Sequence, residues 1–442
     1  MAFMKAIRFF RSVPRWLLVR SLGGTFPGLA TGPFSCLEWA EVEPPPLPAP
    51  DWVRVRPSLS GICGSDLSAI ACTGSPYFAP FVSTPFVLGH EVVGEITATG
   101  PGTPPVWKVG ARVVLEPALG CAVRGLTPPC GPCAAGRYAH CLNILKGTLA
   151  GGIQTGYCAS TGGGWSSSLV AHPSQLHAVP PGLSDEEAVL AEPFACALHG
   201  VVSALQDSKA ESLLVIGCGS IGLLTIAAYR ALGGAARVLA VARYRHQEEA
   251  ARKLGASEVL CTRDAEALYA WILERCGGSL HRPELGKPVA LGGVPVVFDC
   301  VGSAESIDES LRLAAPCGQV VLVGMPGIPK GIDWTAVWYK ALRIQGAYAY
   351  GWEEIGKDLR AGERVTETPA ARNSGELPAP TLSSRRIKTI DLALELMASG
   401  KAGPVKELVN RKHPLESYRL ALDEAFHAGR SGAFKVVFAI GK

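Results

Sequence analysis

Four cysteines, Cys121, Cys130, Cys133 and Cys141, lie within one short segment of the chain. Thiols at this spacing suit three kinds of chemistry, because they can pair as disulfides, remain reduced and buried, or bind one metal ion together. Disulfides are rare in a reducing cytoplasm, so the choice depends on the compartment. The scattered cysteines are interpreted as inert core thiols, namely Cys36, Cys72, Cys261, Cys276 and Cys317. The cluster requires another explanation.

A second candidate site is the segment G-C-G-S-I-G, which contains Gly217, Gly219 and Gly222. It directly follows the apolar segment LLVI and directly precedes an apolar helical segment. Glycines in this context allow a tight turn and let backbone amides approach a pyrophosphate at the helix N-terminus. The segment therefore predicts a dinucleotide site that includes Ser220 and Ile221, and the alternative is a glycine-rich turn without a ligand.

The end of the next strand, in VLAVARYRHQ, indicates which dinucleotide binds. An NAD site usually has an acidic residue about 20 residues after the glycine turn, where it binds the ribose 2′-hydroxyl. Ala242 occupies that position here, and Arg243 and Arg245 follow it. Guanidinium groups suit a 2′-phosphate, so we predict NADP as the preferred cofactor. NAD is the alternative if the arginines are only solvated surface residues.

Two patterns of elements must position these residues. Residues 1 to about 185 contain short apolar segments separated by Gly and Pro, which is typical of a β-rich domain. A helix is then predicted to begin after Ser184, an N-cap with Glu187 three residues later. Apolar strands alternate with helices beyond this point, and the alternation predicts a parallel sheet covered on both faces.

Composition excludes several classes of function. The net charge is only +4 and there is no long basic segment, so nucleic acid is not an expected partner. No segment reaches the roughly 18 to 20 apolar residues needed to span a bilayer. The first 24 residues lack the continuous apolar segment of a signal peptide, and we predict a first strand followed by a loop. We expect a cytoplasmic protein with no membrane partner.

Two polar segments rich in Pro and Gly interrupt the second half of the chain, at residues 277–293 and 359–385. Both are predicted to be surface insertions. Residues 385–402 and 418–429 are predicted helices, and residues 434–440 are the predicted closing strand.

The cysteine cluster resembles the structural-zinc lobe of the zinc-containing medium-chain alcohol dehydrogenases. Three further motifs are similar to the catalytic-zinc segments of that family and occur in the expected order, namely GICGSDL (61–67), GHEVVGEI (89–96) and AEPFACALHG (191–200). The ordered set covers nearly the whole chain and is most similar to the polyol and threonine dehydrogenase branch.

This resemblance implies an α/β protein in which a GroES-like, β-rich catalytic domain is joined to a doubly wound Rossmann domain. The catalytic domain would span residues 1–185, with the zinc lobe near 120–142. The Rossmann domain would span residues 186–350. Residues 351–442 would contain an insertion and a return to the catalytic domain.

The resemblance also implies two zinc ions per chain. The structural ion would be bound by Cys121, Cys130, Cys133 and Cys141, although the eight residues between the first two exceed the family's usual two. The catalytic ion would be bound by Cys63, His90 and Glu192, with the fourth position left for water or substrate. Glu91 matches a carboxylate that can enter or leave the coordination sphere.

Two residues after Cys63 match the family's proton-transfer and orienting positions. Ser65 matches the hydroxyl that takes the substrate proton, and Asp66 matches the carboxylate that orients the zinc-binding histidine. Many relatives continue the proton relay with a histidine five positions after the cysteine, where this chain has Ser68. The proton must therefore leave by another route.

These features lead to one main hypothesis and two alternatives. The main hypothesis is a zinc-dependent dehydrogenase that transfers hydride between NAD(P) and a secondary alcohol, polyol or amino alcohol. A zinc-free NADPH reductase of quinones or enones is the first alternative, and the cysteine and histidine ligands argue against it. A non-enzymatic dinucleotide-binding protein is the second. The expected partner is a small alcohol or carbonyl substrate, in a homodimer or homotetramer.

Overall fold

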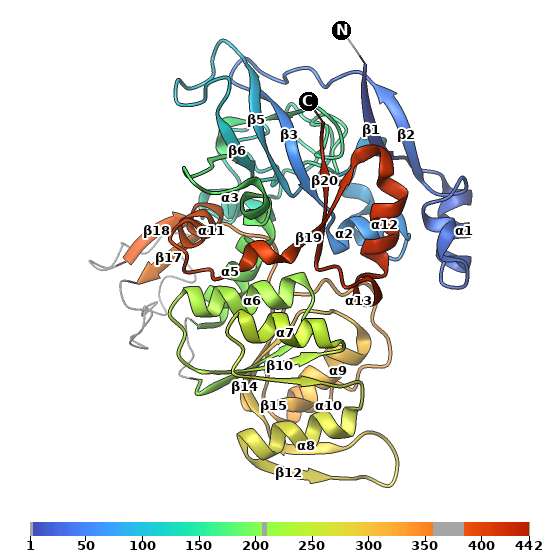
Figure 1. Cartoon of the computed structure of the whole chain (residues 1–442), viewed down its shortest axis with the longest axis vertical. Coiled ribbons are helices and arrows are strands. Elements are labelled where there is room, and N and C mark those ends of the chain that lie inside the picture. Colours follow the sequence, from blue (N-terminus) through green and yellow to red (C-terminus); the bar gives the residue numbers. More distant parts are fainter. Residues whose placement is uncertain (1–2, 206–209, 357–383, 442) are drawn as a thin grey trace. The chain divides into compact units, whose positions relative to one another are not determined.

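The computed structural model describes residues 3–205, 210–356 and 384–441. They form two compact units (Figure 1), of which the first runs to Glu192 and resumes at Lys406, while the second extends from Pro193 to Val405. None of the helices in the described ranges is long and apolar enough to cross a membrane. The predicted insertion at 359–385 lies outside the described residues, apart from its last two positions.

The main sheet of the first unit has the strand order β19–β20–β3–β5–β6–β8, and β7 also pairs with β3. Its strands are β3 (Val53–Gly61), β5 (Val92–Thr99), β6 (Arg112–Leu115), β7 (Leu169–Ala171), β8 (Leu176–Ala178), β19 (Val409–Pro414) and β20 (Lys435–Ala439). Most of β3 alternates between buried and partly buried residues, as expected for an antiparallel strand with one face on the core. The last strand, β20, pairs with β3, so the C-terminal segment completes the sheet formed by the N-terminal half.

A smaller sheet has the order β2–β1–β4, formed by β1 (Met4–Phe9), β2 (Leu37–Val42) and β4 (Phe86–Val87). The prediction of a loop after the first strand is wrong, because helix α1 (Val13–Leu22) follows it. Pro14 lies in the first turn of this helix, where a missing backbone N–H is tolerated. Val19 packs into the core, whereas the arginines that interrupt the apolar segment contact backbone carbonyls.

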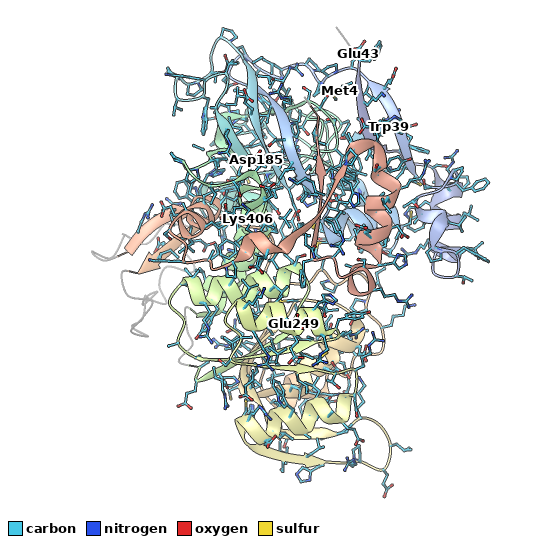
Figure 2. All side chains as sticks on the ribbon, viewed as in Figure 1. Met4, Trp39, Glu43, Asp185, Glu249 and Lys406 are labelled. Atoms are coloured by element: carbon cyan, nitrogen blue, oxygen red, sulfur yellow. The ribbon has the colours of Figure 1, made fainter. Side chains whose placement is uncertain are left out.

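The other helices of the first unit are short and border its sheets. They are α2 (Gly64–Ile70), α3 (Gly131–Ala134), α4 (Asp185–Ala188), α12 (Tyr418–Phe426) and α13 (Ala428–Ser431). The predicted cap of α4 is confirmed, since Ser184 and Glu187 exchange hydrogen bonds in a capping box. Asp185, labelled in Figure 2, accepts hydrogen bonds from Ser58 and Arg112, which tie α4 to the main sheet.

The second unit contains a six-stranded sheet in the order β11–β10–β9–β14–β15–β16, in which every pairing is parallel. Its strands are β9 (Ser212–Ile216), β10 (Arg237–Ala242), β11 (Glu258–Cys261), β14 (Val294–Asp299), β15 (Ala314–Leu322) and β16 (Arg343–Gly346). This order is that of the doubly wound Rossmann fold. Every residue of β9 is buried, as expected for a central parallel strand covered on both faces. The predicted fold class is therefore confirmed.

Helices connect and cover these strands. They are α5 (Ala191–Leu205), α6 (Ser220–Ala231), α7 (Arg245–Lys253), α8 (Ala265–Cys276), α9 (Ala304–Leu313), α10 (Thr335–Tyr339) and α11 (Thr389–Ala398). One apolar core joins β9, β10, β14 and β15 to the inner faces of α8 and α9. The interpretation of Cys261 and Cys317 as core thiols is wrong, because both side chains are exposed. Cys261 is the last residue of β11, and Cys317 lies within β15.

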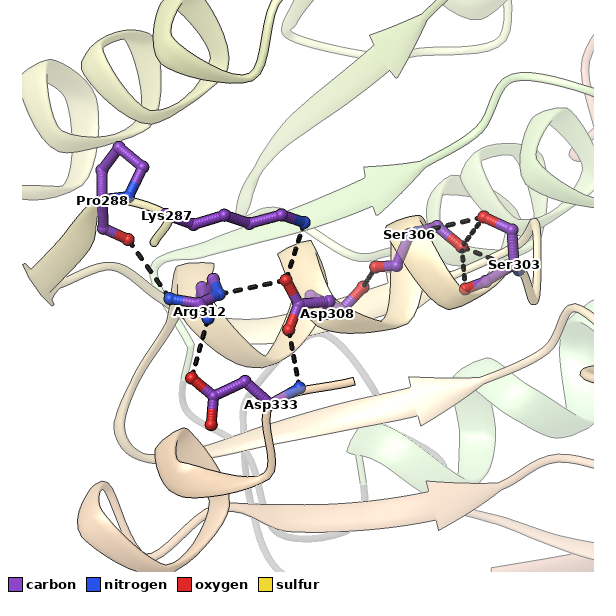
Figure 3. A network of polar contacts seen from close by, with 8 residues as sticks. Lys287, Pro288, Ser303, Ser306, Asp308, Arg312 and Asp333 are labelled. Carbon is purple, nitrogen blue, oxygen red and sulfur yellow. Dashed lines mark hydrogen bonds and ion pairs between the residues drawn. The ribbon is translucent and has the colours of Figure 1, made fainter. Parts of the chain in front are cut away.

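The remaining strands form two hairpins, β12 (Gly278–His281) with β13 (Val289–Gly292) and β17 (Trp352–Gly356) with β18 (Ser384–Lys388). The first hairpin contains the predicted insertion at 277–293. Figure 3 shows how Lys287 attaches this insertion to α9, with its Nζ 2.8 Å from Asp308 Oδ2. Asp308 also pairs with Arg312, which contacts Asp333, so the ion-pair network links three separate segments.

Candidate metal centres and dinucleotide site

The four clustered cysteines converge in one loop region of the first unit. Their sulfur atoms all lie within 4.8 Å of one another. Cys130 caps the short helix α3, which places Cys133 on the same side of the loop, and Cys141 follows a single turn of 3₁₀ helix. The structure thus brings together all four ligands predicted for the structural zinc.

The spacing of the sulfur atoms fits a tetrahedral zinc ion. With Zn–S bonds of about 2.3 Å, tetrahedral sulfurs are about 3.8 Å apart. Here Cys141 Sγ lies 3.6 Å from Cys121 Sγ and 3.9 Å from Cys130 Sγ. Each of the four sulfurs also accepts a backbone N–H, at 3.3–3.4 Å, from Cys121, Cys130, Leu142 or Asn143. Such donors stabilise thiolates that bind a metal.

The unusually long gap between Cys121 and Cys130 contains a fully buried arginine, Arg124. Its guanidinium group donates to the carbonyl oxygens of Leu119, Lys146 and Gly152, among others. Burial lowers the pKa of Arg124, whereas nearby cysteines, including Cys121 and Cys141 of the cluster, raise it. The extra residues therefore form a folded loop around a buried cation, and they do not prevent Cys121 from completing the cluster.

A second group of ligand atoms comes from Cys63, His90 and Glu91, which also lie within 4.8 Å of one another. Cys63 is the N-cap of α2, and its backbone N–H donates to Asp66 Oδ2 at 3.0 Å. His90 and Glu91 lie just before β5, next to the end of β3. One thiolate, one imidazole and one carboxylate are a donor set that suits zinc.

The imidazole of His90 is oriented by two neighbours on α2. Its Nδ1 lies 3.4 Å from Asp66 Oδ1, and its Nε2 lies 3.4 Å from Ser65 Oγ. Burial alone would lower the pKa of His90, but the Asp66 carboxylate and the Cys63 thiol raise it well above its usual value. With Asp66 facing Nδ1, the ring directs Nε2 towards Ser65, as required if Nε2 is to bind a metal beside that hydroxyl.

Glu91 is paired with a residue that sequence reasoning missed, Lys435 on β20. Lys435 Nζ donates to both carboxylate oxygens of Glu91, at 2.6 and 2.8 Å. Burial alone would lower the pKa of Lys435, but Glu91, Cys63 and Glu192 raise it, so the amine stays charged. Gly61 makes room for the carboxylate, since a Cβ there would lie 1.8 Å from Glu91 Oε2.

The third ligand predicted for the catalytic zinc, Glu192, is buried in the first turn of α5. It is near enough to raise the pKa of Lys435. Among the described residues, however, the compact ligand group contains Glu91 in its place. The sequence motif around Glu192 and the geometry around Glu91 therefore point to two different carboxylates.

Tyr157 is the other neighbour of this group that sequence reasoning missed. Its hydroxyl donates to Asp66 Oδ1 at 3.4 Å, and its ring centroid lies 6.0 Å from that of His90. The segment GYCAS around it contains none of the motifs that indicated the other site residues, so only the tertiary structure reveals it.

In the second unit, the glycine turn has the geometry expected of a dinucleotide-binding loop. Gly217 has φ +92°, which favours glycine, and Gly219 is the N-cap of α6. A Cβ on Gly222 would lie 1.8 Å from the carbonyl oxygen of Gly217, so only glycine lets the helix pack this closely against the turn. Ser220 and Ile221 form the first turn of α6, where backbone N–H groups are available to a phosphate.

The end of β10 is basic, as predicted, but its first arginine has a partner. Arg243 Nη2 lies 3.1 Å from Glu305 Oε2, and both side chains are more than half exposed. Arg245 is the first residue of α7. Tyr244 lies between Arg243 and Arg245, and the guanidinium carbon of Arg263 lies 5.2 Å from the centroid of its ring. Ala242 is fully buried and offers no acceptor to a ribose.

Comparisons with known proteins agree with these observations. Residues 49–181 match the family model described as alcohol dehydrogenase GroES-like domain, and residues 220–363 match that described as zinc-binding dehydrogenase. The chain is 28% identical over 318 residues to sorbitol dehydrogenase of Bacillus subtilis, covering 70% of this chain and 80% of that protein. It is 26% identical over 368 residues to L-threonine 3-dehydrogenase of Pectobacterium carotovorum, covering 83% and 94% respectively.

Two solved structures share the fold over nearly the whole chain. A protein described as a zinc-binding dehydrogenase from Sinorhizobium meliloti, bound to NADP, has a TM-score of 0.66 at 22% identity, covering 99% of this chain and 100% of that chain. An alcohol dehydrogenase from Escherichia coli CFT073, in complex with NADH, has a TM-score of 0.68 at 20% identity with the same coverage. These two likenesses show the fold. The two family models and the cysteine cluster show that the chain belongs to the zinc-containing medium-chain alcohol dehydrogenase family, and polyol and threonine dehydrogenases are among its relatives.

Proposed function

We propose that the protein is a dehydrogenase of secondary alcohols, polyols or amino alcohols that binds a structural and a catalytic zinc ion and prefers NADP. The observation that supports it most directly is the convergence of Cys63, His90 and Glu91 beside Ser65. A zinc-free reductase of quinones or enones would not need this donor set. The relatives sorbitol dehydrogenase and L-threonine 3-dehydrogenase suggest the proposed range of substrates.

The residues around the candidate catalytic site have separate tasks. Bound zinc would supply Lewis-acid stabilisation of the substrate oxygen, and the nicotinamide would supply the hydride acceptor. Ser65 Oγ lies 3.4 Å from His90 Nε2, so it could take the proton of a substrate hydroxyl bound at this site while it passes its own hydroxyl proton to water. Asp66 holds His90 through Nδ1, and Lys435 balances the charge of Glu91 within the buried site. In the reverse direction, Ser65 returns the proton to the carbonyl oxygen as it is reduced.

Two carboxylates are candidates for the third ligand of the catalytic zinc, and we propose Glu192 on the sequence motif. Glu91 is already neutralised by Lys435 at 2.6 and 2.8 Å, which disfavours its use as a permanent ligand. Its ligand atom lies within 4.8 Å of those of Cys63 and His90, so it could bind a zinc ion there when the substrate is absent. Glu192→Gln should then reduce catalytic zinc content more than Glu91→Gln does.

The test of the proposed function is metal content combined with turnover. Protein purified from zinc-replete medium should contain close to two zinc equivalents per chain. It should oxidise at least one member of a panel of alcohols, polyols, sugars and hydroxy amino acids with NADP or NAD. Zinc content near zero, or turnover of quinones or enones that survives Cys63→Ala, would refute the proposal.

The proposal includes three further expectations. The proposed preference for NADP rests on Ala242, Arg243 and Arg245, because one of the similar solved structures is bound to NADP and the other to NADH. A cytoplasmic location agrees with zinc-binding thiols that must stay reduced. A homodimer or homotetramer is the expected assembly, to be measured by light scattering.

A further inference from the structure

Tyr157 is held firmly beside the candidate catalytic site by two glycines. Gly156 has φ +87°, and a Cβ there would lie 2.8 Å from the carbonyl oxygen of Gly89. Gly89, with φ +95°, directly precedes His90, and a Cβ there would lie 2.4 Å from the ring of Trp165. The backbone before Tyr157 therefore packs directly on the backbone before His90. Because both positions require glycine, the approach of the two loops is specific to this sequence.

The ring of Tyr157 packs between the site and the core of the first unit. Its centroid lies 5.0 Å from that of Phe86 and 6.0 Å from that of His90. These contacts fix the direction of the ring, so the position of the hydroxyl group is also fixed. A hydroxyl on such a ring is a better orienting group than one on a flexible side chain.

The hydroxyl completes the hydrogen bonding of Asp66. This carboxylate is fully buried, and its Oδ2 accepts the backbone N–H of Cys63 at 3.0 Å. Its Oδ1 faces both His90 Nδ1 and the Tyr157 hydroxyl, each at 3.4 Å. A buried carboxylate is costly unless its lone pairs are occupied, so Tyr157 determines how well Asp66 stays in place.

Ser65 lies beside this group on the same turn of α2. It directly precedes Asp66 in the chain, and its Oγ lies 3.4 Å from His90 Nε2. A hydroxyl that fixes Asp66 therefore also fixes the turn that carries Ser65. One phenol thus holds the carboxylate that faces His90 and, through the backbone of α2, the residue assigned to the substrate proton.

We propose that Tyr157 is a positioning residue of the catalytic zinc site, whose hydroxyl holds Asp66 and Ser65 in the orientation that metal binding and proton transfer need. This inference rests on the proposed function.

Tyr157→Phe removes the hydroxyl and keeps the ring, and Tyr157→Leu removes both. Tyr269→Phe is the matched control, because Tyr269 is a buried tyrosine of the second unit whose hydroxyl has no hydrogen-bond partner among the described residues. The first readout is the visible absorption of protein substituted with Co²⁺, taken as a difference from Cys63→Ala so that only the catalytic site contributes. The second is the rate at which a chelator removes the catalytic metal.

We expect Tyr157→Phe to shift the Co²⁺ bands and to speed metal loss by up to about 10-fold, the lower end of the effect of removing a direct partner of a metal ligand, because Tyr157 acts on His90 through Asp66. The value of kcat should fall by a similar factor while KM for the substrate changes less, and the Tm should stay close to that of the control. Tyr157→Leu should add a loss of stability.

Unchanged spectra and metal release in Tyr157→Phe would overturn the inference. So would a loss of Tm in both variants with an unaltered Co²⁺ spectrum, because the role would then be packing alone. If the unmodified protein binds no metal at Cys63 and His90, this result contradicts the proposed function itself. If it binds metal and turns over substrate, only the role of Tyr157 is in question.

Discussion

At the scale of single residues, the proposed preference for NADP over NAD depends on Arg243. In the free protein its guanidinium pairs with Glu305, so a 2′-phosphate must replace that carboxylate. An exposed ion pair of this kind is worth only about 0–1 kcal/mol, so the exchange costs little. Charge-assisted bonds to the phosphate contribute about 1.5–3 kcal/mol each when well formed, so the balance favours the proposed preference for NADP.

Arg243→Ala should therefore reduce this preference several-fold, mainly through KM for NADP, with NAD nearly unaffected. Glu305→Gln should act in the opposite direction, because it removes the competing carboxylate. Initial-rate kinetics with both cofactors test the pair of variants. Equal or better efficiency with NAD in the unmodified enzyme would mean that the arginines are only a solvated surface.

At the scale of elements, the two candidate zinc sites differ in the kind of secondary structure that positions their ligand residues. The structural site consists mostly of loop, with the four-residue helix α3 and one turn of 3₁₀ helix before Cys141, and its shape would depend on the metal and on Arg124. The candidate catalytic site lies at the ends of β3 and β5 and at the start of α2, where sheet and helix hydrogen bonds hold the backbone without help. The metal should contribute folding free energy at the first site and little at the second.

Cys133→Ala should lower the Tm clearly, since each kcal/mol lost shifts the Tm of a domain of this size by about 2–4 °C. Cys63→Ala should abolish turnover with little change in Tm, because it empties only the catalytic site. Calorimetry and zinc analysis of both variants, with Cys158→Ala as a control outside either cluster, separate the two effects. The same phenotype for both variants would show that the roles are assigned wrongly.

At the scale of the whole molecule, the chain's return to its first unit brings a charge to the site. Lys435 lies 344 positions from Glu91 in sequence, and β20 carries it there by pairing with β3. Removing one member of a buried ion pair costs about 3–5 kcal/mol, because the other charge remains buried and unpaired. Lys435→Met should therefore lower the free energy of unfolding by an amount of that order.

The double variant Lys435→Met with Glu91→Gln should recover most of this loss, since no uncompensated charge remains. Chemical denaturation of the unmodified, single-variant and double-variant proteins measures the difference. A double variant as unstable as Lys435→Met alone would indicate that Lys435 acts through packing and not through its charge.

The sequence by itself determined the features that depend on local pattern. The Cys130, Cys133 and Cys141 spacing, the glycines of residues 217–222 and the buried parallel strands are all local, because ligand spacing, tight turns and burial on two faces each constrain neighbouring positions. The helix after β1 was missed because Pro14 and the arginines obscured its periodicity, although proline is accepted in a first turn.

Only the tertiary structure decided which distant side chains complete the candidate sites. Lys435 and Tyr157 reach Glu91 and Asp66 through sheet pairing and through the close packing of two glycine loops, and neither stands in a motif. The pairing of Arg243 with Glu305 likewise joins the end of β10 to the first turn of α9, two segments that are far apart in sequence. Local patterns specify an element and its chemistry, whereas the partners of a buried charge or hydroxyl depend on how the chain packs far from that position in sequence.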